Sequence, residues 1–466
     1  MPKQGFYITT AIDYTNDVIH IGHAYQKILA DAIARYHRQK GEKTFFLTGT
    51  DEHGQKVEKA AKAKNIDPQK FVDQIAKKDK EEWDTLNISY DRFFRTTDND
   101  HIKFAQEFYL KSYANNDIYE SEYEGLYCEG CEEFKDESDL KDGKCPIHPT
   151  KEVQKVKEKN YFFALSKYQK FLIDHIEKHP KFIVPKSKRK EVLSFIKAGL
   201  KDFSVSRQNL KWGIPVPNDP SQTIYVWFDA LINYLTYAVE KNCWPADIHV
   251  LGKDNLKFHA IYWPAMLKSA GYELPKTILC HDYISLNGKK VSKSLGNVIL
   301  PSELVKRFGV DAVRYYFLRY GPLTNDTDIS IEKIQEVYNA DLANGLGNLV
   351  SRVATLAQKS EFEFPITDAP QSFDLELEIP LKELEINKSI ESIWTKIKEL
   401  DQLINHKKVW TLKEEDLKKT LEFIVNDIRQ ISYDLKPFLP QTAEKIYKQF
   451  GSSKIKTDKP LFPRRK

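Results

Sequence analysis

The sequence predicts an α/β fold, in which a parallel sheet flanked by helices is followed by an all-helical C-terminal region. Short apolar runs alternate with helical periodicity up to about residue 117, and this alternation resumes at about residue 223. Between them, residues 119–160 are densely charged, which indicates an insertion. From about residue 311 apolar residues recur at helical spacing almost to the end of the chain. Short strands that alternate with helices favour a parallel, doubly wound sheet, and the continuous helical pattern favours a bundle.

The first elements can be placed individually. A buried strand is expected at residues 5–10 and a loop at 16–20. A helix follows from about Gly22 to Gly41, and a second buried strand occupies 44–50. The apolar face of the helix is formed by Tyr25, Leu29, Ala32 and Tyr36. A further helix begins near Gln55.

Composition bounds the functional class. The 466 residues suggest about three domains. The net charge of +4 neither requires nor excludes a nucleic acid partner. No segment reaches the ~20 apolar residues of a membrane span, and the N-terminus does not resemble a signal peptide. An odd number of cysteines, five, fits a reducing setting, so we expect a cytoplasmic protein.

The stretch "VIHIGHAY" (18–25) places two histidines and a glycine where a strand-loop unit meets a helix. The free N–H groups and positive dipole of a helix start suit a phosphate, and His20 and His23 add side-chain donors. Gly22 between them would let a ligand approach the backbone closely. A pair of histidines that merely caps the helix explains the same tetrapeptide, so alone it leaves both interpretations open.

A second candidate is the loop "NGKKVSKSLGN" (287–297), which follows a predicted hairpin turn at Asn287-Gly288. Ammonium groups on such a loop can stabilise charge that develops on a polyphosphate. A solvated basic loop is the alternative.

The insertion contains a metal-ligand spacing. Cys128 and Cys131 are separated by thirteen intervening residues from the knuckle Cys145-Pro-Ile-His148. Three thiolates and one imidazole form a closed tetrahedral set for a structural zinc ion. A disulfide, or cysteines that simply pack in a core, are the alternatives; the core interpretation is preferred for Cys243 and Cys280.

Taken together, His20-Ile-Gly-His23 and Lys290-Val-Ser-Lys293-Ser form a pair that resembles the signature of class I aminoacyl-tRNA synthetases. Other segments resemble, in order, those of the methionyl-tRNA synthetases within that class: 45–54, 123–131, 225–234, 252–267 and 292–298. The resemblance extends from about Phe6 to beyond Trp410.

The resemblance implies a methionine–tRNA ligase. The methionine carboxylate would attack the α-phosphate of ATP, and the adenylate would then pass its acyl group to the 3′-terminal adenosine of initiator and elongator tRNA(Met). Since the carboxylate is already ionised, this step needs positioning and charge stabilisation rather than a general base. Mg²⁺ is expected with the ATP, and one structural Zn²⁺ per chain is implied, because a branch of the family carries a single Cys3His set here.

The resemblance also implies a division into five segments. A Rossmann-type catalytic domain would comprise residues 1–117 and 221–300, interrupted by a zinc-bearing connective insertion at 118–220. Residues 301–340 would form a linker that contacts the tRNA stem and contains the end of the lysine loop. Residues 341–466 would form an anticodon-binding bundle.

Roles follow by position. His20, His23, Lys290 and Lys293 would be catalytic. Gly22, Gly252, Asp254 and Lys293 would bind ATP. The methionine site would consist of Ile12, Tyr14, Asp51, Trp227, Ala230, Tyr234 and His259, with Asp51 on the α-ammonium group and aromatic edges on the thioether.

Several of these positions also have plainer explanations. Asp51 would serve equally as a cap of the following helix. A stripe such as Trp227, Ala230 and Tyr234 is typical of a core.

Arg207 matches a family arginine near the active site. Asp13 and Asn255 depart from the family by placing polar groups beside an apolar pocket, so Asn255 is expected to turn away or find a partner.

The C-terminal bundle would read the anticodon through Asn348 and Arg352, one turn apart on a helix, and through Trp410, which matches a family tryptophan that stacks on a base. A place in the bundle core is the alternative for Trp410.

The short insertion leaves no room for a separate editing domain, and the chain is expected to be a monomer. A nucleotidyl transferase without a tRNA substrate and a catalytically silent tRNA-binding relative are the rival functions.

Overall fold

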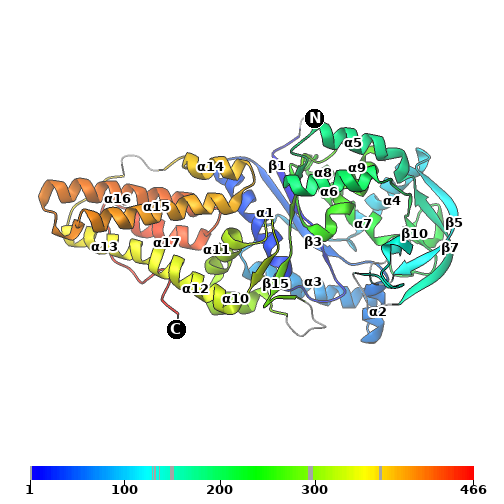
Figure 1. Ribbon diagram of the computed structural model, residues 1–466, viewed down its shortest axis with the longest axis horizontal. Coiled ribbons are helices and arrows are strands. Elements are labelled where there is room, and N and C mark those ends of the chain that lie inside the picture. Colours follow the sequence, from blue (N-terminus) through cyan, green and yellow to red (C-terminus); the bar gives the residue numbers. More distant parts are fainter. Residues whose placement is uncertain are drawn as a thin grey trace. The chain divides into compact units, whose positions relative to one another are not determined.

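The computed structural model describes residues 3–128, 130, 133–135, 137–146, 152–291, 298–366 and 370–465. It confirms the α/β class, with a parallel sheet and a helical C-terminal region (Figure 1). The chain forms two compact units. Unit 1 comprises Met1–Val18, Phe45–Lys80 and Tyr90–Cys280, and unit 2 comprises Ile19–Thr44, Glu81–Ser89 and His281–Lys466.

Unit 1 is built on a seven-stranded sheet of order β2-β3-β1-β13-β14-β8, in which β4 also pairs with β3. Every pairing with a described register is parallel, for example Ile8 with Ile248 and Leu47 with Arg92. The strands are β1 (Phe6–Thr10), β2 (Asp13–Tyr14), β3 (Thr44–Asp51), β4 (Arg92–Arg95), β8 (Ile183–Val184), β13 (Ile248–Gly252) and β14 (Thr277–His281). The two strands predicted first, at 5–10 and 44–50, are thus confirmed; the two-residue β2 falls in the gap before the predicted loop.

The first two helices of unit 1 form a small apolar cluster that includes Val57 and Phe71. The others pack on a larger apolar core that includes Tyr7, Leu47, Phe94 and Trp263. The helices are α2 (Gln55–Ala63), α3 (Pro68–Thr85, which ends in unit 2), α4 (Asn99–Ala114), α5 (Gln169–Lys178), α6 (Lys186–Lys197), α7 (Val226–Leu231), α8 (Asn233–Lys241) and α9 (Trp263–Ser269). Cys243 and Cys280 are fully buried in this core, as predicted.

The insertion folds as antiparallel sheets. The long, curved hairpin of β5 (Ile118–Cys128) and β7 (Val153–Phe163) is flanked by β6 (Glu133–Lys135) and β9 (Phe203–Ser204) (Figure 1). A second sheet pairs β10 (Ser206–Arg207), β12 (Asp219–Ile224) and β11 (Pro215–Val216). Exposed cross-strand ion pairs such as Lys159–Glu120, 2.8 Å, explain the dense charge of this segment.

Unit 2 contains the helix that begins with the histidine motif and the helices of the C-terminal half. They are α1 (Ile21–Gln39), α10 (Pro301–Phe308), α11 (Val310–Tyr320), α12 (Ile331–Val337), a π-helical segment (Tyr338–Gly347), α13 (Asn348–Ser360), α14 (Leu375–Lys382), α15 (Ile386–His406), α16 (Glu414–Leu435) and α17 (Pro440–Phe450). In Figure 1 α13, α15, α16 and α17 run side by side, which confirms the predicted bundle.

A small sheet in unit 2 carries the start of the lysine loop. β15 (Ile284–Leu286) pairs with β16 (Lys289–Lys290) across a turn in which Asn287 and Gly288 have φ of 52° and 71°. Positive φ at both positions is what the predicted Asn-Gly turn requires. β15 also pairs in parallel with β17 (Thr327–Ile329), a strand that the expectation of nearly continuous helix after residue 311 did not include.

A buried ion pair joins three elements of unit 2. Arg314 of α11 is fully buried and its Nη1 lies 2.7 Å from Oδ2 of Asp31 on α1. Its Nε donates to the carbonyl of Phe438, between α16 and α17, at 2.8 Å. Burial alone would raise the pKa of Asp31, but Arg314 and Arg35 outweigh it and the pKa is lowered. The helix that starts with the histidine motif is therefore tied to the bundle.

Within the described part of the chain, no helix is long and apolar enough to cross a membrane.

Candidate functional site

The two histidines of the first motif begin α1. His20 is the N-cap residue, and its Nδ1 accepts a hydrogen bond from the amide of Gly22 at 3.1 Å. The amide of His20 donates in turn to Nδ1 of His23, also at 3.1 Å. The two rings lie with centroids 4.1 Å apart. The capping interpretation is thus correct. When Nδ1 accepts a hydrogen bond, a neutral imidazole carries its proton on Nε2.

Gly22 serves the cap itself. A Cβ at this position would lie 2.8 Å from Cε1 and 2.9 Å from Nδ1 of the His20 ring. The close approach that requires a glycine is therefore that of the His20 side chain; the sequence suggested a ligand.

The lysine loop is described only in part. The backbone of Lys290 lies in β16 and pairs with Ser285. Lys293 lies outside the described residues, so its predicted role remains a prediction.

The predicted methionine and ATP residues of unit 1 gather at one edge of the parallel sheet. Asp51 is the last residue of β3, Gly252 is the last of β13, and Ile12 follows β1, which lies between these strands. Tyr14 pairs with Asp51 through β2. The carboxyl ends of parallel strands are where open α/β sheets bind ligands.

Two aromatic side chains form a stacked wall at this edge. The rings of Trp227 on α7 and Phe258, just before α9, are parallel within 4° and their centroids are 3.8 Å apart. The buried indole Nε1 of Trp227 has no hydrogen-bond partner among the described residues. Ala230, one helical turn further on α7, is 6% exposed. Such a wall offers apolar surface and one N–H donor.

Tyr234 and His259 form the polar part of the same region. Burial lowers the pKa of His259 to about 4, so the ring is neutral at pH 7. Its Nδ1 lies 2.9 Å from the carbonyl of Asn255, which can only accept, so Nδ1 carries the proton. The Tyr234 hydroxyl, 2.7 Å from Nε2, is therefore the donor of that hydrogen bond. Burial, and then the carboxylates of Asp51 and Asp13, hold the pKa of Tyr234 above its ordinary value, although a hydrogen bond with Asn233 opposes this.

The structure also places three further residues that the sequence singled out, and their predicted roles remain predictions. Asp254 is exposed and Asn255 is half-buried, with its backbone carbonyl bonded to His259. Asp13 is buried in β2 beside β3.

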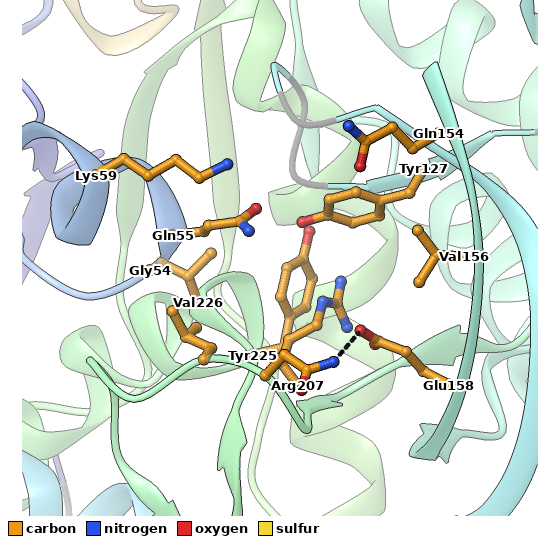
Figure 2. A pocket seen from close by; sticks show the side chains of 12 residues that line it. Gly54, Gln55, Lys59, Tyr127, Gln154, Val156, Glu158, Arg207, Tyr225 and Val226 are labelled. Atoms are coloured by element: carbon orange, nitrogen blue, oxygen red, sulfur yellow. Dashed lines mark hydrogen bonds between the residues drawn. The ribbon is translucent and has the colours of Figure 1, made fainter. Parts of the chain in front are cut away.

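A pocket of about 230 Å³ lies against the insertion in unit 1 (Figure 2). Gly54, Gln55 and Lys59 line one side, and side chains of the β5–β7 hairpin line the other. Arg207 is buried between them. Its guanidinium lies 4.0 Å from the ring centroid of Tyr225 and 5.7 Å from that of Tyr127. A cation over aromatic faces suits a flat, electron-rich ligand.

Two of the four predicted zinc ligands belong to the described residues. Cys128, at the end of β5, and Cys145 are both fully buried, and neither forms a disulfide. Cys131 and His148 lie outside the described residues. Groups of three or more metal ligands do not occur in the part of the chain that is described.

Two of the three predicted anticodon residues are brought together in unit 2. The guanidinium of Arg352 on α13 lies 5.1 Å from the ring centroid of Trp410. Arg352 is held by Asp401, 3.0 Å, and Asn405, 2.7 Å, both on α15. Trp410 is 54% exposed, so the core interpretation is wrong for it. Asn348 is exposed at the first position of α13.

Three aromatic or imidazole side chains near the predicted methionine residues were not predicted from the sequence. Phe258 directly precedes His259 and was not singled out as the partner of Trp227. His249, buried on β13, has its ring centroid 4.5 Å from that of Tyr234. His53 follows Asp51 by two residues. In the sequence, the only sign of a role for these three residues is that each is aromatic or polar and lies close to a predicted site residue.

Comparison with known proteins gives one consistent family. The family model described as "tRNA synthetases class I (M)" matches residues 6–153 and 135–354. The chain is 43% identical to the methionine–tRNA ligase of Caldanaerobacter subterraneus and 44% identical to that of Clostridium perfringens. These matches cover 96% and 97% of the chain and 74% of each relative.

Solved structures agree. Mycobacterium tuberculosis methionyl-tRNA synthetase in complex with methionyl-adenylate is similar to the chain with a TM-score of 0.91 and 35% identity. The match covers 99% of the chain and 100% of that structure.

Proposed function

The chain belongs to the methionyl-tRNA synthetase family of class I tRNA synthetases and is a methionine–tRNA ligase, and on this premise we propose which residues carry out the reaction. The single observation that carries the proposal is the cluster at the carboxyl edge of the sheet in unit 1. There the Trp227–Phe258 wall and the Tyr234–His259 pair adjoin strand ends that carry Asp51 and Gly252.

Methionine binds with its α-ammonium group at Asp51 and its thioether at the aromatic wall. A thioether accepts hydrogen bonds weakly and favours aromatic surroundings. Since the Tyr234 proton is directed at His259, we assign the sulfur to the indole N–H of Trp227, which has no hydrogen-bond partner among the described residues. Ile12, Tyr14 and Ala230 complete the lining.

The methionine assignment is tested by ATP–pyrophosphate exchange. Asp51→Asn and Trp227→Ala should each raise the KM for methionine at least tenfold and leave the KM for ATP near the wild-type value. An unchanged methionine KM in both variants would remove this cluster from the substrate site.

ATP binds through its phosphates to His20 and His23, with Gly252 and Asp254 on the nucleoside. Since Nδ1 of each ring accepts a backbone amide, the donor hydrogen of a neutral ring is on Nε2, and an imidazole N–H at a helix start suits a phosphate. Lys290 and Lys293 hold the pyrophosphate side as charge develops. Mg²⁺ accompanies the ATP phosphates and neutralises part of their charge. None of these side chains has to act as a base, because the attacking carboxylate is already ionised.

The acceptor end of tRNA enters the pocket at Arg207. Bases of single-stranded nucleic acid are bound by stacking and by cationic side chains, and Arg207 with Tyr225 and Tyr127 supplies both. Lys59 adds positive charge on the facing side. Arg207→Gln should slow transfer of the methionyl group to tRNA more than it slows adenylate formation; an equal effect on both steps would contradict this placement.

A structural Zn²⁺ is held by Cys128, Cys131, Cys145 and His148. Two buried thiols without a disulfide, in an insertion with little core of its own, fit such a group. One zinc per chain is expected by metal analysis of protein purified without chelators. Protein that is folded, active and free of zinc would refute the site.

The anticodon of initiator and elongator tRNA(Met) binds at Asn348, Arg352 and Trp410. The exposed indole beside a fixed guanidinium offers a stacking surface for an unpaired base.

The enzyme acts as a monomer in the cytoplasm. A mass of one chain, 54.2 kDa, in light scattering is the expected result.

A further inference from the structure

A carboxylate held by two imidazoles lies in the interior of unit 1. Asp229 of α7 is fully buried. Its Oδ2 accepts a hydrogen bond from Nδ1 of His53 at 2.7 Å, and its Oδ1 lies 2.5 Å from Nε2 of His101. His53 is 4% exposed and His101 is fully buried. Nothing in the proposed reaction uses these three side chains.

The cluster joins elements that are distant in sequence. His53 belongs to the loop after β3, between Asp51 and Gly54. His101 lies in α4, and its Nδ1 is 3.2 Å from Oγ1 of Thr236 on α8. Asp229 itself lies between Trp227 and Ala230 on α7. One carboxylate thus connects the loop, α4 and α7, and α8 follows through His101.

The surroundings of the cluster are aromatic. The ring of Phe94 meets that of His101 edge-on at 5.2 Å, and Trp212 meets His53 at 5.6 Å. Burial would raise the pKa of Asp229, but the two imidazoles outweigh burial and the pKa is lowered. A buried polar network of this kind is costly unless every member is satisfied, and when satisfied it fixes one arrangement of the elements it joins.

The connected elements are the two ends of the proposed methionine site. The loop begins directly after Asp51, the last residue of β3, which is assigned to the α-ammonium group, and α7 carries Trp227, which is assigned to the thioether. We propose that Asp229 is a positioning residue that fixes the distance between Asp51 and the Trp227 wall, so that the site selects amino acids by side-chain length. This inference rests on the assignment of Asp51 and Trp227 made above.

The direct test is Asp229→Asn, which keeps the shape of the side chain and removes its charge. In ATP–pyrophosphate exchange the KM for methionine should rise about tenfold, the scale of one hydrogen bond to a charged group, while the KM for ATP stays within about twofold. Ethionine, one methylene longer, should lose much of its disadvantage, since one methylene in a fitted pocket is worth about 10- to 200-fold.

The histidines supply a second test with a built-in rescue. His53→Ala removes the donor to Asp229, whereas the amide of His53→Asn can replace Nδ1–H. We expect the alanine variant to reproduce the Asp229→Asn phenotype and the asparagine variant to restore the methionine KM to within about twofold of wild type. This pair carries the test if Asp229→Asn does not fold.

Asp247→Asn is the matched control. Asp247 is a largely buried, ion-paired carboxylate of the same unit, bonded to the amide of Tyr7 and paired with Lys276, and it contacts neither α7 nor the loop after β3 in any described bond. It should leave the methionine KM and the ethionine discrimination unchanged. If Asp229→Asn and His53→Ala lower thermal stability as Asp247→Asn does but leave both kinetic quantities unchanged, the cluster is only structural and the inference is overturned.

Asp51→Asn separates the two levels of the argument. A raised methionine KM in Asp51→Asn with a normal one in Asp229→Asn overturns this inference alone. A normal methionine KM in Asp51→Asn overturns the site assignment, and this inference with it.

Discussion

At the scale of single residues, the hydrogen-bond partner of each histidine determines what its ring can do. The backbone amide on Nδ1 of His20 leaves Nε2–H as the donor. The backbone carbonyl on Nδ1 of His259 leaves Nε2 as an acceptor, which the Tyr234 hydroxyl fills. The two rings therefore differ at Nε2: His20 would present a donor, which is proposed for phosphate, whereas His259 presents an acceptor, which bonds to the tyrosine of the proposed methionine site.

The donor role of His20 is tested by His20→Ala. The variant loses a donor to developing phosphate charge, so adenylate formation should fall about 10²- to 10³-fold, with little change in the KM for methionine. Loss of the cap should also lower the free energy of unfolding by about 1 kcal/mol. His37→Ala, near the other end of the same helix, is the control and should retain the wild-type rate. A normal rate in His20→Ala would exclude the residue from the mechanism.

The buried state of His259 predicts a pH dependence of stability. The unfolded chain has a pKa near 6.5 at this residue and the folded chain one of about 4, because burial disfavours the charged ring. Between these values the unfolded state binds the extra proton, so the free energy of unfolding should fall as pH is lowered from about 6.5 to 4. The contribution of this group is about 3 kcal/mol.

Chemical denaturation at several pH values checks this effect. His259→Gln should flatten the pH dependence over that interval, and His406→Gln, which changes an exposed histidine of α15, should not. Identical slopes in all three proteins would contradict the assignment.

At the scale of elements, α1 is positioned by its charge partners as well as by its apolar face. The carboxylate of Asp31 forms ion pairs with Arg314 and Arg35 and accepts hydrogen bonds from the amide and hydroxyl of Ser89. The other N–H groups of Arg314 donate hydrogen bonds to backbone carbonyls, including those of Phe438 and Pro437. Removal of one partner leaves a buried charge with fewer compensating bonds.

Arg314→Met should accordingly lower the free energy of unfolding by about 3–5 kcal/mol in chemical denaturation. Lys170→Met, which removes an exposed pair with Asp174, should have no measurable effect. The double variant Asp31→Asn, Arg314→Met should recover part of the loss, since neither charge then remains. Additive losses would show that the two residues act independently.

The elements also show what a sequence can and cannot predict. Helix α1 and the Asn287-Gly288 hairpin were predictable, because apolar spacing and turn chemistry are local. The strand β17 was not, since three residues gain their structure from pairing with β15, some forty residues earlier. The cluster of His53, His101 and Asp229 was also hidden, because its members lie in separate segments that only the folded chain brings together. The family resemblance implied that Trp227 and Tyr234 belong to the methionine site. The direction of the Tyr234–His259 hydrogen bond could be deduced only from the structure.

At the scale of the whole molecule, the proposed functions divide between the two units. Unit 1 contains the proposed methionine site, the pocket at Arg207 and the cysteine-bearing insertion. Unit 2 contains the His20–His23 cap, the start of the lysine loop and the cluster of Arg352 and Trp410. The residues proposed to bind phosphate and those proposed to bind the anticodon are therefore parts of one compact unit, which the buried pair of Asp31 and Arg314 stabilises.

The anticodon role predicts a loss confined to the tRNA step. Trp410→Ala should lower kcat/KM for tRNA(Met) about 10- to 100-fold, the scale of one lost base stack, while ATP–pyrophosphate exchange stays near the wild-type rate. Phe423→Ala, which removes another exposed aromatic side chain of unit 2, should leave both steps unchanged. A comparable fall of exchange and aminoacylation in Trp410→Ala would refute the role.

As a methionine–tRNA ligase this chain activates methionine, and we propose that it does so through a site built from Asp51, Trp227, Tyr234 and His259. The most direct measurement is ATP–pyrophosphate exchange by the purified protein with each of the twenty amino acids in turn. Methionine should have the highest kcat/KM by a wide margin, and Trp227→Ala should reduce this margin. Fastest exchange with another amino acid, or exchange with none, would contradict it.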